Sequence, residues 1–311
     1  MSKHQTCKDY KMKSHCDTLS GVFSPVVTLF EGGLLDLLSL RKNLKIVAKS
    51  GLKGYLALGS NGEFMSLSEQ EQLQVLEVFA EEKADKVIMV GTARESSKHT
   101  IDFSNRVAQM GFEYVSVLTP HYFAKQMNGP TLERYYTRIA DEVKVPVLLY
   151  NAPGFAGGVH IPPATVAKLA EHPNIAGMKD SSPTGPAKFL NVCGSGDDFA
   201  ILAGSANFLY PSLHLGAPGG IVSVANFLPD PCCEMYSSFM AADYDKARDL
   251  HFRLARLNAA VSGAYGVAGV KAAMALTGFS GGEPRHPLIP VDDDGRALIA
   301  AAIEREGFKQ V

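Results

Sequence analysis

The feature that most constrains the fold is a series of eight short apolar runs, which begin on average about 28 residues apart. Each run is rich in Val, Ile, Leu or Tyr and is bounded by Gly, Pro, Asn or Asp, as buried strands are. Continuous apolar runs suit parallel strands that are covered on both faces. The sequence therefore predicts eight parallel strands, within Val22–Leu29, Gly54–Leu58, Val87–Gly91, Tyr114–Leu118, Val145–Tyr150, Ile175–Met178, Phe199–Ala203 and Gly220–Val224.

The segments between these runs carry helix signals. Ser68 and Glu71 have the spacing of a capping box, and Pro130 lies where a helix is expected to begin. Eight alternating strand and helix units predict an α/β fold of the (β/α)8 TIM barrel type. The alternative is an open doubly wound sheet, which usually has a glycine-rich phosphate turn after its first strand. Here the first strand ends in Thr28-Leu29-Phe30, which favours the barrel.

The chain divides into three predicted parts. Residues 1–20 are polar and read as a flexible tail, residues 21–228 form the barrel, and residues 229–311 form a C-terminal helical extension packed on it. The tail lacks the apolar stretch of a secretory signal and the arginines of a mitochondrial transit peptide. We therefore expect a cytoplasmic protein, with a lysine-rich mitochondrial import signal as the alternative. Helices of the extension are expected near 230–258, 267–277 and 293–305.

Composition excludes several classes of function. Thirty Lys and Arg against 32 Asp and Glu leave no positive surplus for nucleic acid. No apolar run reaches the roughly 18 residues of a membrane span. The five cysteines are an odd number without CxxC spacing, which is typical of reduced thiols inside a cell. The nine histidines form no HxH or HExxH pattern, so we expect no metal site built from histidines.

Active sites of such barrels lie at the carboxyl ends of the strands, and two reactive residues end predicted strands here. Lys179 follows the sixth run, where partial burial would lower the pKa of its amine and make it a nucleophile. Tyr150 ends the fifth run, where its hydroxyl could transfer protons. The plainer alternatives are a lysine that reaches solvent or pairs with Asp180, and a core tyrosine with a satisfied hydroxyl.

A third candidate element follows the second run. Gly59-Ser60-Asn61-Gly62-Glu63 places a hydroxyl and an amide between two glycines. Such a tight turn exposes backbone N–H groups and is a potential cradle for a carboxylate or a phosphate. The alternative is an ordinary turn, which glycine and asparagine favour in any case.

Taken together, these motifs resemble the dihydrodipicolinate synthase / N-acetylneuraminate lyase family of class I aldolases. The resemblance extends from about Gly21 to the C-terminus. Within this family, the chain looks most like the branch of 4-hydroxy-2-oxoglutarate aldolases. It is carried by GSNGEF (59–64), YNAP (150–153), HPNIAGMKDS (172–181), LAGSANFL (202–209) and YGVAGVKAAMALTGFSGGEPRHPL (265–288).

The resemblance implies roles for three catalytic residues. Lys179 would form an imine with the 2-oxo group of the substrate, and Tyr150 would move protons during imine formation and carbon–carbon cleavage. Tyr122 matches a tyrosine that reaches the proton relay of a neighbouring subunit. The family is typically a homotetramer built as a pair of dimers, and its lysine chemistry needs no cofactor.

Five further positions match residues of the family that hold the substrate. Ser60 and Asn61 would bind the carboxylate of the 2-oxo acid. Ser181 could contact the substrate, while the backbone at Gly204 and Val222 would line the imine pocket. Asn61 departs from the usual threonine, and an amide cannot shuttle protons as a hydroxyl does.

A second departure bears on the substrate. Synthases that condense pyruvate with aspartate semialdehyde have an arginine where this chain has Phe155. Phenylalanine cannot bind a carboxylate in the bidentate manner of arginine. An arginine of the C-terminal region, such as Arg285 or Arg253, is an alternative partner for that carboxylate.

The sequence therefore predicts a Schiff-base aldolase that cleaves 4-hydroxy-2-oxoglutarate to pyruvate and glyoxylate. A 2-keto-3-deoxy sugar acid aldolase and a dihydrodipicolinate synthase are the alternatives within this chemistry. A metal-dependent lyase and a barrel that binds a small molecule without catalysis are the alternatives from other classes. No nucleic-acid or membrane partner is expected.

Overall fold

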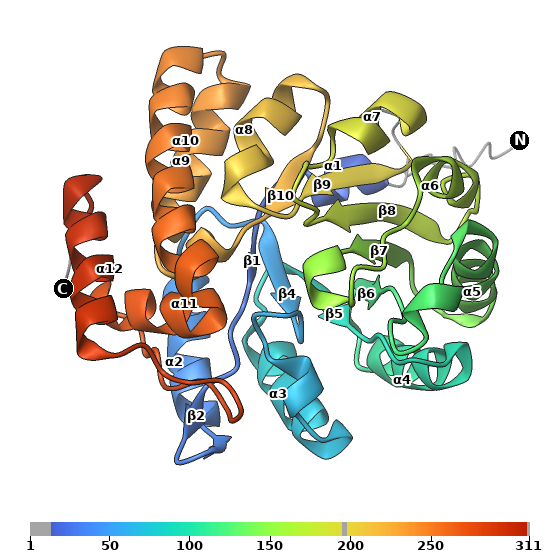
Figure 1. The fold of residues 1–311 in the computed structure, drawn as a ribbon, viewed down its shortest axis with the longest axis horizontal. Helices are drawn as coiled ribbons and strands as arrows, with labels where there is room; N and C mark the ends of the chain where they lie inside the picture. Colours follow the sequence, from blue (N-terminus) through green and yellow to red (C-terminus); the bar gives the residue numbers. More distant parts are fainter. Residues whose placement is uncertain (1–13, 195–197, 310–311) are drawn as a thin grey trace, which may run out of the picture.

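The computed structural model describes residues 14–194 and 198–309, and its centre is a closed barrel of eight parallel strands (Figure 1). The strands are arranged in the order β1-β10-β9-β8-β7-β6-β5-β4 around the barrel. This confirms the predicted (β/α)8 architecture. The strands are β1 (Gly21–Pro25), β4 (Gly54–Ala57), β5 (Val87–Gly91), β6 (Tyr114–Leu118), β7 (Val147–Asn151), β8 (Ile175–Asp180), β9 (Ala200–Ala203) and β10 (Gly219–Ile221).

Helices surround the barrel and begin where the sequence signals them. The Ser68 hydroxyl accepts a hydrogen bond from the Glu71 N–H, and the Glu71 carboxylate accepts one from the Ser68 N–H, which confirms the capping box. Pro130 lies in the first turn of its helix, as predicted. The surrounding helices are α2 (Leu37–Val47), α3 (Glu69–Glu82), α4 (Ser97–Gln109), α5 (Gly129–Glu142), α6 (Pro163–Leu169), α7 (Ala187–Cys193) and α8 (Ala206–His214).

The carboxyl ends of four strands lead into short 3-10 helices. These turns are too short to be seen as a hydrophobic period in the sequence. They shape the loops of the barrel mouth, where the candidate residues lie. They are η1 (Phe64–Ser66) after β4, η2 (Ala124–Gln126) after β6, η3 (Pro153–Phe155) after β7 and η4 (Ser223–Asn226) after β10.

The segment before the first strand corrects one prediction. Residues 1–20 were expected to form a flexible tail, but His15–Leu19 form a helix, α1. Leu19 is fully buried in the barrel interior with Phe23, Leu56 and other strand residues, so α1 closes the amino-terminal end of the barrel. One apolar residue in a polar segment gives no periodic signal, which is why the sequence did not reveal it. Residues 1–13 lie outside the described residues.

Two other elements differ from the prediction. A small hairpin, β2 (Phe30–Glu31) and β3 (Leu34–Leu35), follows the first strand and was not expected. The helix expected over 230–258 is divided into α9 (Pro229–Met240) and α10 (Tyr244–Asn258). The division occurs at Ala242, whose φ of 61° is left-handed, and the side chain of Asp243 then caps α10.

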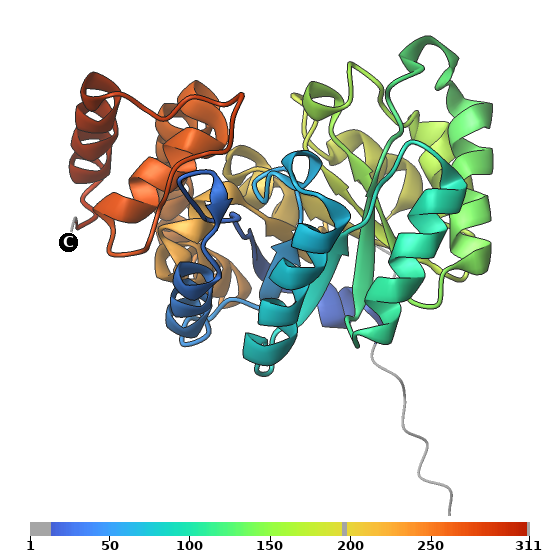
Figure 2. The same cartoon turned by 90° about the horizontal axis from the view of Figure 1, so that it is seen from below.

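The C-terminal helices lie together at one side of the barrel (Figure 2). After α10, the chain continues through a π-helical turn, η5 (Ala259–Gly263), into α11 (Ala264–Leu276) and later α12 (Asp293–Arg305). Gly266 has φ 57° and ψ −142°, so the backbone of α11 is kinked near its start. This kink lies beside the mouth of the barrel.

The continuous helical stretch Tyr244–Leu276 is long and apolar enough, by length and composition, to cross a membrane. Its first half, however, has charged residues throughout, including Arg248, Asp249 and Arg253. In its second half the ammonium of Lys271 forms an ion pair with Glu63 of the barrel at 2.6 Å. These charged residues and this ion pair belong to helices that pack on the barrel.

Candidate active site

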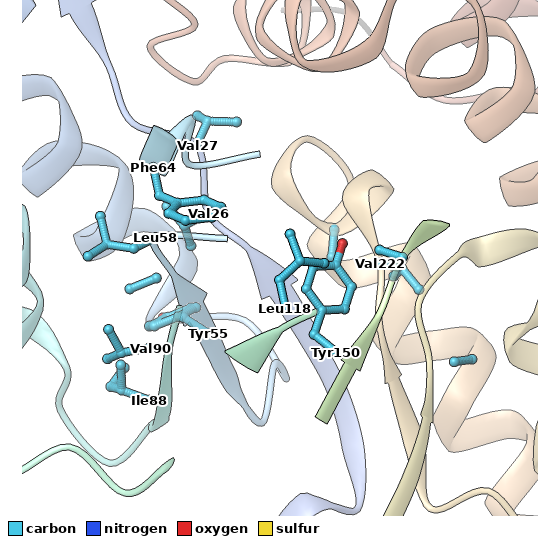
Figure 3. Close-up of a cluster of buried hydrophobic side chains, with 14 of the residues drawn as sticks. Val26, Val27, Tyr55, Leu58, Phe64, Ile88, Val90, Leu118, Tyr150 and Val222 are labelled. Carbon is cyan, nitrogen blue, oxygen red and sulfur yellow. The ribbon is translucent and has the colours of Figure 1, made fainter. Parts of the chain in front are cut away.

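Lys179 and Tyr150 are direct neighbours on adjacent strands. The register of β7 and β8 pairs Tyr150 with Lys179, and Nζ of Lys179 lies 4.7 Å from the centre of the Tyr150 ring. Only 4% of Lys179 is exposed, and Tyr150 is buried as well. Figure 3 shows the Tyr150 ring beside Leu118, with Val222 on its other side. The structure thus brings the predicted nucleophile and the predicted proton carrier into contact.

Asp180 does not serve as the partner of Lys179. Because side chains alternate along a strand, the two consecutive residues point to opposite faces of β8. The Asp180 carboxylate accepts hydrogen bonds from Asn151 Nδ2 at 2.6 Å and from Ser182 Oγ at 2.8 Å. It is therefore already paired behind the barrel wall, and the alternative of a Lys179–Asp180 ion pair is ruled out by geometry.

The turn after β4 brings Ser60 to this candidate pair. Ser60 Oγ lies 3.4 Å from the hydroxyl of Tyr150, at the long limit of a hydrogen bond. Asn61 Nδ2 donates to Ser223 Oγ at 2.9 Å, which fixes the amide across the mouth. Ser223 was not among the predicted residues, since nothing in the sequence links the second and eighth strand ends.

Ser181, Gly204 and Val222 lie around the same barrel end. The N–H of Ser181 donates to the carbonyl of Asn151 at 2.8 Å, and the N–H of Gly204 donates to the carbonyl of Asp180 at 2.8 Å. A Cβ at Gly204 would fall 2.1 Å from Ser181 Oγ, so the close approach of these two strands requires glycine. Val222 is fully buried beside Tyr150.

Tyr122 is the one predicted site residue that lies apart from the others within the chain. It is 78% exposed and packs edge-on against exposed Phe123, with ring centres 5.0 Å apart. Its backbone N–H and that of His121 donate to the Glu95 carboxylate, which holds this loop in place. The predicted role of Tyr122 in a neighbouring subunit stays a prediction.

A cavity of about 480 Å³ opens above the Ser60–Asn61 turn. Ser60 links this cavity to the buried pair, because it both lines the cavity and approaches Tyr150. Phe155 lines the cavity and is 60% exposed there. The other lining residues are Asn61, Glu63, Phe64, Met65, Ser66, Leu118, Ser262, Tyr265, Gly266, Val267, Ala268, Pro287, Leu288 and Ile289.

Neither of the two alternative arginines reaches this cavity. The guanidinium of Arg285 binds the Glu71 carboxylate at 2.7 Å and the carbonyls of Gly33 and Ser66. Arg253 donates to the carbonyl of Glu306 at 2.7 Å and packs over the ring of Phe308. Both are held elsewhere, so they do not replace the arginine that is absent at position 155.

Sequence reasoning missed a buried ion pair beneath the Ser60–Asn61 turn. Glu63 and Lys271, 208 residues apart, pair at 2.6 Å with side chains that are each 1% exposed. Glu63 also accepts the N–H of Arg285, and Lys271 donates to the carbonyl of Glu283. Burial lowers the pKa of Lys271, and the carboxylate of Glu63 opposes that change. The pair therefore ties the turn to α11 and to the 283–285 segment.

We predict that Lys271→Met lowers the free energy of unfolding by about 3–5 kcal/mol, because it leaves the Glu63 carboxylate buried without its counter-charge. Denaturant unfolding monitored by circular dichroism measures this change. The matched double variant Glu63→Leu/Lys271→Met removes both charges and should recover much of the loss. A single variant within about 1 kcal/mol of the wild type would show that the pair does not stabilise the turn.

The described residues contain no group of three or more His, Cys, Asp or Glu that could hold a metal ion. No disulfide joins the cysteines in the described part of the chain, and Cys7 lies outside it. Cys232 is fully buried, and burial raises the pKa of its thiol. The reactive groups that the structure gathers at the barrel mouth are thus the amine of Lys179 and the hydroxyls of Tyr150 and Ser60.

Comparison with known proteins identifies curated relatives of this chain. The chain is 36% identical to a 4-hydroxy-tetrahydrodipicolinate synthase of Methanospirillum hungatei JF-1, over 92% of this chain and 98% of that one. It is 33% identical to an uncharacterized DapA-like lyase of Halobacterium salinarum, over 93% of this chain and 95% of that one.

Solved structures show the same likeness. YagE of E. coli K12, solved in complex with pyruvate, superposes with a TM-score of 0.86 at 27% identity, over 93% of this chain and 98% of that one. The 4-hydroxy-tetrahydrodipicolinate synthase of Methylacidiphilum fumariolicum SolV superposes with a TM-score of 0.85 at 26% identity, over 93% and 96%.

The family model described as the dihydrodipicolinate synthetase family matches residues 18–306, which is nearly the whole chain. The match includes the barrel, the lysine on β8 and the C-terminal helices. The chain therefore belongs to the dihydrodipicolinate synthetase family and is a carbon–carbon lyase of the class I aldolase type.

Proposed function

We propose that this enzyme cleaves 4-hydroxy-2-oxoglutarate to pyruvate and glyoxylate through a Schiff base on Lys179. The observation that carries the proposal is the buried contact between the Lys179 ammonium and the Tyr150 ring, with Ser60 at the tyrosine hydroxyl. A buried amine next to a proton carrier is the arrangement that nucleophilic catalysis by lysine requires. The pyruvate held by YagE supports a 2-oxo acid as the ligand.

The proposed reaction conserves atoms and charge through three stages. The amine of Lys179 adds to the C2 carbonyl, and Tyr150 donates its hydroxyl proton so that water leaves as the protonated imine forms. Tyr150 then takes the proton of the C4 hydroxyl, the C3–C4 bond breaks, and its electron pair moves into the iminium to give an enamine. Glyoxylate leaves, Tyr150 passes that proton to C3 of the enamine, and water hydrolyses the protonated imine, which releases pyruvate and returns a proton to Tyr150. The imine lowers the barrier because no free carbanion forms.

Ser60 and Asn61 are proposed to hold the carboxylate next to the 2-oxo group. Their turn lies at the mouth end of the barrel, with Ser60 near Tyr150 and Asn61 held by Ser223. Binding the carboxylate there orients the carbonyl toward Lys179, which is a proximity effect. Ser181 and the backbone at Gly204 and Val222 are proposed to line the imine pocket.

The substrate preference rests on the distance between the reacting carbon and the second carboxylate. In 4-hydroxy-2-oxoglutarate that carboxylate is bonded directly to the carbon that becomes the aldehyde. In aspartate semialdehyde two carbons lie between the aldehyde and the carboxylate. The longer molecule extends its charge into the cavity at Phe155, whose lining residues include no lysine or arginine. A desolvated carboxylate without a cationic partner is costly.

We predict that kcat/KM for release of pyruvate from 4-hydroxy-2-oxoglutarate exceeds kcat/KM for condensation of pyruvate with aspartate semialdehyde. The absence of a cationic partner for the carboxylate of aspartate semialdehyde should cost about 1.5–3 kcal/mol, which lowers kcat/KM for the condensation by roughly 10–150-fold. Both reactions are measured in one buffer. Phe155→Arg should raise the rate with aspartate semialdehyde, and Phe155→Leu, the matched control, should not. If kcat/KM for the condensation is tenfold or more above kcat/KM for the cleavage in the wild type, the enzyme is a synthase. That is the name of its curated relative from Methanospirillum hungatei.

We further propose a homotetramer in which Tyr122 of one subunit completes the proton relay of another. The support is the exposure of Tyr122 and Phe123 on a loop that Glu95 holds rigidly. The family's typical location supports the cytoplasm as the compartment. A 2-keto-3-deoxy sugar acid is a weaker candidate substrate, because its hydroxylated tail would meet the largely apolar lining of the cavity.

A further inference from the structure

The cavity above the candidate active site has an unusual rim. Four large apolar side chains around its opening are substantially exposed, and exposed apolar clusters of this kind mark binding sites. They are Met65 at 68%, Phe155 at 60%, Leu288 at 44% and Ile289 at 78%. They come from three separate parts of the chain, η1, η3 and the segment before α12. The rim is therefore formed by the fold and is not a single apolar stretch of sequence.

The polar residues that line the cavity are almost all neutral. Ser60, whose Oγ approaches the Tyr150 hydroxyl, and Asn61 line the cavity where it meets the candidate pair, and Ser66, Ser262 and Tyr265 line it as well. The only charged lining residue among the described residues is Glu63. Its carboxylate already forms an ion pair with Lys271 and accepts a hydrogen bond from the N–H of Arg285. A bound molecule thus finds neutral polar groups and apolar side chains, and no unpaired charge among the described lining residues.

The outer wall of the cavity is fixed by the kinked start of α11. The non-helical backbone at Gly266 turns residues 265–268 toward the mouth, and the buried Lys271–Glu63 pair holds α11 against the barrel one turn later. The volume of about 480 Å³ falls within the rough range of 300–1,000 Å³ that small-molecule sites have. It is larger than a two-carbon aldehyde needs.

We propose that this cavity binds the aldehyde half of a second class of substrates, 4-hydroxy-2-oxo acids whose aldehyde half is an uncharged apolar chain. The inference rests on the proposed lysine chemistry and extends it to a longer substrate. C1 to C4 occupy the polar floor between Lys179 and Ser60, while the alkyl chain beyond C4 lies between Phe155 and Ile289. The bond changes are those already written, with an alkyl aldehyde leaving in place of glyoxylate.

The test is condensation of pyruvate with glyoxylate, propanal, butanal, pentanal and glyceraldehyde. Because burying one methylene group is worth a factor of about four, kcat/KM should rise about threefold to fourfold per carbon from propanal to pentanal. Glyceraldehyde has the carbon number of propanal and should react more slowly than it, since its hydroxyls lose water in an apolar cavity. A flat or falling series would overturn the inference.

Matched variants test whether the apolar rim of the cavity causes the preference for longer aldehydes. Ile289→Asp should lower the ratio of kcat/KM for pentanal to that for glyoxylate by at least about tenfold, because it places a charge beside the chain. Leu298→Asp adds the same charge at a residue of α12 that is 63% exposed and does not line the cavity, so it should leave the ratio unchanged. An unchanged ratio in Ile289→Asp contradicts the inference. A flat series together with loss of subunit assembly in Ile289→Asp also contradicts it, and assigns the rim to a subunit contact.

Pyruvate trapping separates this inference from the proposed function. If borohydride traps pyruvate on Lys179 but the aldehyde series is flat, only the inference about apolar chains fails. If no adduct forms with pyruvate, the proposed lysine chemistry itself fails.

Discussion

Replacement of Lys179 by alanine is expected to lower the rate of pyruvate release by at least about 10⁴-fold, the scale seen when an enzyme loses its nucleophile. The reason is that Lys179 lies beside Tyr150, whereas the other buried lysine of the described residues, Lys271, is paired with Glu63. Without the imine, cleavage of the C3–C4 bond has no electron acceptor. The measurement is pyruvate release from 4-hydroxy-2-oxoglutarate, coupled to lactate dehydrogenase.

A matched control distinguishes this effect from general damage. Lys168→Ala removes an exposed lysine that pairs with Glu133 on the surface, and it should leave the rate unchanged. The far-ultraviolet circular dichroism of Lys179→Ala should match that of the wild type, which shows that the barrel has folded. A folded Lys179→Ala enzyme that retains more than a few per cent of the wild-type rate is incompatible with a covalent role for this lysine.

The second large effect is expected at Tyr150. Tyr150→Phe should lower kcat by roughly 10²–10⁴-fold, the usual contribution of one general acid–base group. The ring that packs beside Leu118 and Val222 is kept, so the loss reports on the hydroxyl alone. Because pyruvate binding depends mainly on Ser60 and Asn61 in the proposed site, KM should change much less than kcat.

Tyr210→Phe is the matched control for this substitution. Its hydroxyl donates to the carbonyl of Tyr244 at 3.3 Å, among the C-terminal helices. It should therefore leave kcat unchanged. If Tyr150→Phe also turns over near the wild-type rate, Tyr150 is a core residue whose hydroxyl serves packing and hydrogen bonding only.

The barrel could be predicted from the sequence because its strands are local and apolar. Each run can be recognised within about five residues, without information from distant parts of the chain. Rules for parallel sheets then place Tyr150 and Lys179 at the same barrel end. What those rules do not supply is the register, which decides that the two residues are direct neighbours.

The features that escaped prediction depend on contacts between distant parts of the chain. Glu63 and Lys271 are hydrophilic residues whose burial follows only from their pairing across 208 positions. Likewise Ser223, which holds Asn61, is 162 residues away from it in the sequence. Leu19 is buried only because it packs against strand residues at the amino-terminal end of the barrel. No local pattern encodes such contacts, since the partner segment supplies the reason for each.

The apolar rim of the mouth illustrates the same point. Phe155 could be recognised in the sequence as a departure from arginine, but Met65 lies in the short 3-10 helix η1 and Ile289 in a loop, and neither segment has a periodic signal. Their side chains meet around one cavity only after α11 has packed on the barrel. The sequence thus indicates that the site lacks an arginine at position 155, and the fold shows that apolar side chains surround the cavity there.

The central claim is that Lys179 forms an imine with a 2-oxo acid, and covalent trapping tests it most directly. The wild-type enzyme is incubated with pyruvate and borohydride, and the intact mass and the peptide map are recorded. The account predicts one pyruvate-derived adduct per chain, located on Lys179 and absent from Lys179→Ala. An adduct that persists undiminished in Lys179→Ala, or a wild-type enzyme that turns over substrate without any adduct, would contradict it.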